Sequence, residues 1–243
     1  MQPPLPLVPQ PTPENRYPNC VYMKLQGVPV RSQSSTVPEV SSQIELHLTL
    51  NFNEQWEAGV GGQIKFGLRG GRLRLTLENG IISPESRPLT GSVKLAIQKS
   101  ETYQEQIRLQ NETSSEQGQT GTLANLPIAD SSDRVSFTTC KIATKGVADN
   151  RTWAFAIDPG KEVLNGCIKN VKLATINVIA KPCCITASFE ISPHDVSLTQ
   201  TDFFWQKTLT KKRNAVIERA IVRHLFQQKL TPYLSRQSLQ YDL

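Results

Sequence analysis

The sequence predicts a mainly β protein, an antiparallel β sandwich built as one unit or as two β layers or subdomains, with a C-terminal α-helix. Three observations predict this fold class. Apolar and polar residues alternate in several segments before residue 206, and glycines and prolines separate these segments. After residue 207 the apolar spacing becomes that of a helix, and no proline occurs before Pro232. Many strands followed by one helix are typical of a sandwich, whereas an α/β fold would repeat both elements.

The chain is expected to have three parts. Residues 1–19 contain seven prolines, which remove backbone donors and favour extended structure, so they are expected to form a flexible tail. Residues 20–206 form the β-sandwich domain, which includes a polar surface loop near residues 100–133 and one short strand at residues 107–109. Residues 207–243 form a basic C-terminal helix and tail. A chain of 243 residues can bury a sizeable core.

The strand predictions depend on alternation and on turn residues. Residues 44–52 alternate strictly and predict a half-buried strand. Residues 63–78 predict a hairpin with a two-residue turn at Gly70-Gly71, which would pair Leu68 with Leu73. A second hairpin about Lys181-Pro182 would pair residues 171–180 with residues 183–191. Shorter strands are expected at residues 93–97, 135–142 and 153–157, with turns at residues 79–80 and 158–160.

The predicted helix has apolar residues on more than one side. They form two stripes at helical spacing: Ile217, Ile221 and Leu225, and Val222, Phe226 and Leu230. One sheet contact buries only one side of a helix, so the second stripe suggests an interface with a partner or with a second copy of the chain.

The net charge of +6 is confined to the same region. Residues 205–243 contain eight basic and two acidic residues, and the preceding residues are balanced. A charge excess on one element indicates a local anionic partner, such as an acidic protein face or nucleic acid.

Nothing in the sequence indicates export or a membrane span. The N-terminal residues lack a basic segment followed by an apolar run, and the longest nearly apolar stretch, residues 171–180, contains a lysine. The five cysteines fit neither a disulfide framework nor a zinc motif, and the role of the vicinal pair Cys183-Cys184 is left open. A cytoplasmic location is therefore expected.

No catalytic motif is evident, and neither a cofactor nor a metal site is expected. The glycine clusters lack the strand, loop and helix order of a phosphate-binding site. Catalytic partners meet in space rather than in sequence, so His194 with Cys183 or Cys184 leaves a cysteine-dependent enzyme as a third alternative.

The candidate partner- or anion-binding residues form two sets. The hairpin set is Lys65, Arg69, Arg72 and Arg74. In the predicted hairpin Arg69 would lie beside Arg72, and like charges side by side suggest an anionic partner. Charged residues also protect the edges of sheets, which is the alternative explanation. The helix set is Lys212, Arg219, Val222, Arg223 and Phe226. The sequence thus predicts a non-enzymatic protein-binding or adaptor module that presents its helix to a partner protein. The alternative is a nucleic-acid-associated accessory protein that uses both basic patches.

Overall fold

The computed structural model describes residues 12–31, 40–59, 62–86, 89–97, 136–146, 150–203 and 211–242. The predicted polar loop, the short strand within it and most of the proline-rich segment lie outside these residues. Strands make up 62% of the described residues and pair antiparallel, and one α-helix lies near the C-terminus. The predicted mainly β fold with a C-terminal helix is therefore confirmed.

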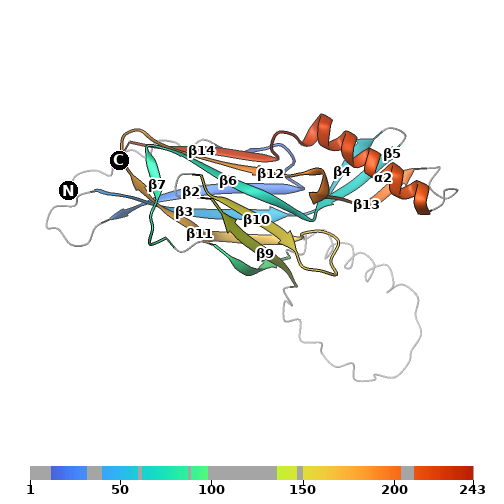
Figure 1. Ribbon diagram of the computed structural model, residues 1–243, viewed down its shortest axis with the longest axis horizontal. Coiled ribbons are helices and arrows are strands. Elements are labelled where there is room, and N and C mark those ends of the chain that lie inside the picture. The colour runs from blue at the N-terminus through green and yellow to red at the C-terminus, as the bar shows by residue number, and fades with distance from the viewer. Residues whose placement is uncertain are drawn as a thin grey trace, which may run out of the picture.

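Fourteen strands are present in the described parts of the chain (Figure 1). They are β1 Glu14–Asn15, β2 Val21–Arg31, β3 Val40–Phe52, β4 Gln55–Gly59, β5 Gly62–Leu68, β6 Gly70–Glu78, β7 Gly80–Ile82, β8 Gly91–Ala96, β9 Phe137–Lys145, β10 Thr152–Ile157, β11 Gly166–Val178, β12 Cys183–Glu190, β13 Val196–Phe203 and β14 Ser235–Tyr241. The helical elements are a short 3-10 turn η1 Pro193–Asp195, the α-helix α2 Lys211–Leu225, and the π-helical turn η3 Phe226–Leu230 that continues it.

The strands form a large sheet and a small one. The large sheet has eleven strands in the order β1-β14-β12-β6-β10-β9-β8-β11-β3-β2, with β7 paired to β11 beside this path. The small sheet has the order β13-β5-β4. Figure 1 shows the large sheet along the long axis of an elongated molecule, with the small sheet and α2 together at one end.

The large sheet encloses the core with the alternating residues of its strands. In β3 the residues at positions 44, 46, 48, 50 and 52 are all buried, as the alternation predicts. Three phenylalanine rings meet across the interior: Phe52, Phe155 and Phe189 have centroids 5.6–6.0 Å apart. Such contacts between aromatic rings add to the stabilisation that burial of each ring provides.

The predicted hairpin at Gly70-Gly71 is wrong. Strand β5 pairs with β4 and β13 in the small sheet, whereas β6 pairs with β10 and β12 in the large sheet. The chain passes from one sheet to the other at Arg69, whose N–H donates to the Asp195 carbonyl at 2.7 Å. The glycines allow close packing here, because a Cβ on Gly70 would lie 2.6 Å from the Phe155 carbonyl oxygen and one on Gly71 would lie 2.5 Å from the Phe189 ring.

The predicted hairpin about Lys181-Pro182 is also wrong. Strand β11 pairs with β3, β7 and β8, whereas β12 pairs with β6 and β14. The apolar alternation of each strand was identified correctly. However, alternation fixes which face of a strand is buried and does not identify the neighbouring strand.

Both ends of the described chain contribute strands where tails were expected. Residues 14–15 form β1, and residues 235–241 form β14, which pairs with β12 over seven residues and with β1 over two. In β14 the buried positions alternate with exposed ones, but two of the buried residues are Ser235 and Gln237. These polar side chains hide the period of two from a search for apolar alternation.

Side chains of β1 and β14, at one end of the strand order, close the large sheet against the edge strand β2 at the other end. On β14, the Ser235 hydroxyl donates to the Val21 carbonyl at 3.2 Å, the Gln237 Oε1 accepts from the Leu25 N–H at 2.6 Å, and the Tyr241 hydroxyl donates to the Gly27 carbonyl at 3.1 Å. On β1, the Asn15 side chain bonds both the N–H and the carbonyl of Met23. We call this boundary, formed by Asn15, Ser235, Gln237 and Tyr241 against β2, the side-chain seam. It meets the hydrogen-bonding needs of an edge strand, which would otherwise be open to another chain.

Candidate functional site

The candidate site is helix α2, which packs beside the small sheet. Leu225 and, in the following π turn, Leu230 are buried, with exposed fractions of 3% and 1%. Ile221, Val222 and Phe226 are partly buried against the same core. At the end of this region Lys229 forms an ion pair with Glu57 of β4, and the carboxylate raises the pKa of the Lys229 ammonium. The C-terminal half of the helical region is therefore attached to the protein by apolar and ionic contacts.

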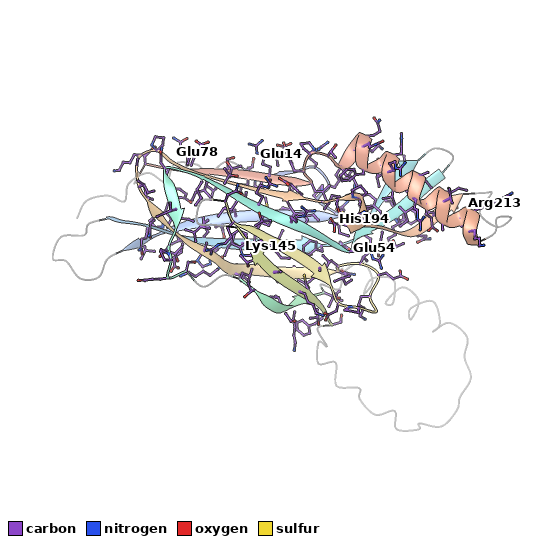
Figure 2. All side chains as sticks on the ribbon, viewed as in Figure 1. Glu14, Glu54, Glu78, Lys145, His194 and Arg213 are labelled. Carbon is purple, nitrogen blue, oxygen red and sulfur yellow. The ribbon has the colours of Figure 1, made fainter. Side chains whose placement is uncertain are left out.

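The N-terminal half of α2 is more exposed. No residue whose burial is described between positions 212 and 220 is buried, and Figure 2 shows Arg213 at the extreme end of the molecule. Lys212, Arg213, Arg219 and Arg223 are all exposed, and no ion pair to any of them is found within the described residues.

We define the basic face as Lys212, Val216, Arg219 and Arg223, which fall within a narrow arc at 100° per residue. Val216 has an exposed fraction of 64%, which makes it the one large exposed hydrophobic residue on the described part of the helix. The first turn has no acidic residue, so its cations oppose the helix dipole. The basic face therefore combines charges that nothing in the described chain neutralises with one exposed apolar side chain.

Two of the sequence-predicted helix residues do not belong to this face. Val222 and Phe226 are partly buried and contact the protein's own core. Of the predicted stripes, Ile217 is half-buried, and the exposed large hydrophobic residue on the described part of α2 is Val216, which the two-stripe pattern did not include. Val216 lies one helical turn after Lys212 and one turn before Ala220. This spacing could have placed Val216 on the same side of the helix as the cations.

The four cations of the predicted hairpin do not form one patch. Lys65, in the small sheet, pairs with Glu54 at 3.2 Å and lies 6.0 Å from the centre of the Trp56 ring. Arg72 and Arg74 lie in the large sheet, where Arg74 pairs with Glu190 at 3.5 Å.

Arg69 lies between the two sheets and is exposed, and Arg72 is the strand neighbour of Glu190 rather than of Arg69. A carboxylate therefore accompanies Lys65 and Arg74, whereas the described residues supply none to Lys212, Arg219 or Arg223.

The suggested pairing of Cys183 or Cys184 with His194 is not formed. The cysteines begin β12 and the histidine follows its other end, so the strand of eight residues places about 23 Å between them at 3.3 Å per residue. Figure 2 shows His194 toward the helical end and Glu78, the strand neighbour of Cys184, toward the opposite end. Burial raises the pKa of the Cys183 thiol, which disfavours its reactive thiolate form.

The described residues contain no group of three or more His, Cys, Asp or Glu side chains that could hold a metal ion. No helix in the described ranges has both the length and the apolar character needed to cross a membrane.

Comparison with known proteins finds no family model that matches the chain and no significantly similar curated protein.

Proposed function

We propose that the protein is a non-enzymatic binding module that holds an acidic face of a partner protein against the basic face of α2. The observation that carries this proposal is the set of exposed cations Lys212, Arg219 and Arg223 around the exposed Val216; the described residues form no ion pair with these cations. An acidic partner surface would neutralise these charges and also offset the unfavourable helix dipole in the first turn. Val216 would provide the apolar contact that a protein surface can meet.

The same observations favour a protein over nucleic acid. Lys212 and Arg223 are eleven residues apart on α2, so the basic face is only about 17 Å long at 1.5 Å per residue. The hairpin cations do not extend it, because Lys65 and Arg74 already pair with carboxylates. Single-stranded nucleic acid usually stacks its bases on exposed aromatic side chains, and the described exposed residues of α2 include no Phe, Tyr or Trp.

Two labelled probes of equal net charge test this proposal: a poly-glutamate peptide and a DNA duplex. Fluorescence anisotropy at physiological salt should show tighter binding of the peptide. The triple substitution Lys212→Gln, Arg219→Gln and Arg223→Gln should weaken peptide binding about tenfold, if each exposed charge pair contributes about 0.5 kcal/mol.

The matched control removes the same charge elsewhere, by Lys145→Gln, Lys161→Gln and Lys169→Gln, all at exposed positions. This control should leave peptide binding unchanged. Tighter binding of the duplex, with a steep salt dependence that the helix substitutions reduce, would instead support the nucleic-acid alternative. Failure of both probes to bind would contradict a binding role for the basic face.

A further inference from the structure

A surface hollow of about 530 Å³ lies on the outer side of β2, on the part of the molecule that also carries the side-chain seam. Its polar lining residues are Thr12, Lys24, Gln26, His47, Asn170 and Gln237. Pro13 and Val28 add apolar surface. The volume falls within the range of small-molecule sites, and the hollow is separate from α2, which none of its lining residues belongs to.

The hollow is bounded by two irregular segments. On one side, β11 has a register shift between Ile168 and Val171, and Asn170 within it adopts a left-handed conformation with a φ of 51°. The Asn170 N–H donates to the Thr49 hydroxyl at 3.0 Å, which fixes this rim above β3. On the other side, residues 12–13 lead into β1, which pairs with β14.

The floor comes from regular strands and from the seam. Gln26 of β2 is the strand neighbour of His47 of β3, and Gln237 of β14 is 95% buried beneath them, where its side chain bonds the Leu25 N–H. Because the strands are held by backbone pairing and the Gln237 side chain by packing, the shape of the hollow exists before any ligand enters. A preformed site loses less conformational entropy when it binds.

The charge of the hollow favours an anion. Lys24 is exposed and has no ion pair within the described residues, and none of the lining residues is acidic. Among the described residues, two carboxylates adjoin lining residues: Glu14, which follows Pro13 and accepts a hydrogen bond from the Tyr233 hydroxyl, and Glu45, 3.6 Å from His47. Lys172 donates to the Glu45 carboxylate at 2.5 Å, and that hydrogen bond lowers the pKa of Glu45, so the negative charge of Glu45 is paired with Lys172. Within the described residues Lys24 therefore has no ion pair, and its positive charge is available to a ligand.

The other polar groups favour a ligand with several hydroxyls. The Gln26 and Asn170 side chains each offer amide donors and an amide acceptor, and Thr12 adds a hydroxyl. We propose that this hollow binds a small polyhydroxylated anion, a sugar phosphate or a sugar acid, with its anionic group at Lys24 and its hydroxyls at Gln26 and Asn170. Val28 and Pro13 would then contact the apolar face of the sugar ring.

Four probes titrated into the ¹⁵N-labelled full chain test the proposal by NMR: glucose 6-phosphate, glucuronate, glucose and inorganic phosphate. The two anionic sugars should shift the amide resonances of Gly27 and Asn170, and each should bind more tightly than glucose or phosphate. Glucose 6-phosphate and glucuronate together identify which anionic group is preferred. Phosphate binding as tight as that of glucose 6-phosphate, or no shift with any probe at millimolar concentration, would overturn the proposal.

Three variants locate the binding. Lys24→Gln should weaken the anionic sugars about tenfold, as expected for loss of one charge-assisted hydrogen bond, and leave glucose unchanged. Lys161→Gln removes an equal charge from a distant turn and should change nothing. Asn170→Gly keeps the left-handed backbone available while deleting the amide, so it should weaken glucose and both anionic sugars alike. If Lys24→Gln bound the anionic sugars as tightly as the unmodified protein, the proposed site would be contradicted. This outcome is independent of the result for the basic face of α2.

Discussion

Helix α2 and strand β14 are close neighbours in sequence but differ in how the protein uses them. Strand β14 places alternate residues in the interior and bonds to residues more than 200 positions away, through Ser235, Gln237 and Tyr241. Helix α2 buries little beyond Leu225 and exposes its cations. The excess charge therefore lies mainly on an element that contributes little to the core. A residue there can be selected for binding with little effect on stability, whereas β14 is constrained by the fold.

The largest difference in stability between the large sheet and α2 should appear when an aromatic ring is removed from the core. Phe189→Ala on β12, the neighbour of β14, removes a fully buried side chain that contacts Phe52 and Phe155. It should lower the free energy of unfolding by about 3–5 kcal/mol, measured by urea denaturation. Val216→Ser on α2 should change it by less than about 0.5 kcal/mol. Similar losses in the two variants would show that α2 is as important to stability as the large sheet.

A somewhat smaller effect is expected at alkaline pH from the seam. Burial raises the pKa of Tyr241 from 10.0 to about 12. The folded state thus retains this proton when the unfolded state loses it, so the contribution of Tyr241 is complete below pH 10 and disappears as the pH rises through 12. At 1.36 kcal/mol per pKa unit, the shift of the Tyr241 pKa corresponds to about 2–3 kcal/mol of folding stability lost across this pH range.

Tyr241→Phe removes this dependence, so the variant should lose less stability than the unmodified protein between pH 9 and pH 12. Denaturation at a series of pH values measures the difference. Burial also raises the pKa of Cys20 and Cys140, but these thiols titrate in both proteins and cancel in the comparison. Parallel alkaline profiles would contradict the contribution assigned to Tyr241.

The smallest of the three effects on stability should come from loss of one hydrogen bond of the side-chain seam, from the Leu25 N–H to Gln237. Gln237→Leu preserves the approximate side-chain size but leaves the buried Leu25 N–H without its acceptor. The free energy of unfolding should fall by about 1–3 kcal/mol, the cost of an unsatisfied buried polar group. Gln240→Leu, at an exposed position of the same strand, is the matched control and should be close to neutral. A neutral Gln237→Leu would mean that the seam does not depend on this bond.

The sequence predicted individual strands well and their pairing badly. The alternation of β3 identified its buried residues because each strand carries that information locally. The glycines at positions 70 and 71 were interpreted as a turn, but they are needed where β6 passes close to Phe155 and Phe189, residues far away in sequence. Alternation cannot distinguish a glycine required by a turn from one required by a distant neighbour.

The candidate site was predicted in part. Lys212, Arg219 and Arg223 lie together on α2 because helical spacing is a local property. The grouping of Lys65 and Arg69 with Arg72 and Arg74 depended on the wrong hairpin. The surface hollow could not have been found from sequence, because its lining residues come from positions 12 to 237 and meet only when the seam closes.

The seam also constrains the order in which the protein can assemble during synthesis. Strand β2 is translated early and so is Asn15, but the other three side chains that satisfy its outer edge lie at positions 235, 237 and 241. Until those residues leave the ribosome, the nascent chain exposes a long unpaired edge that other chains could bind. Contacts between such distant residues also slow folding, because a long loop must close before they form. We therefore expect the protein to need protection from aggregation chiefly while it is being translated.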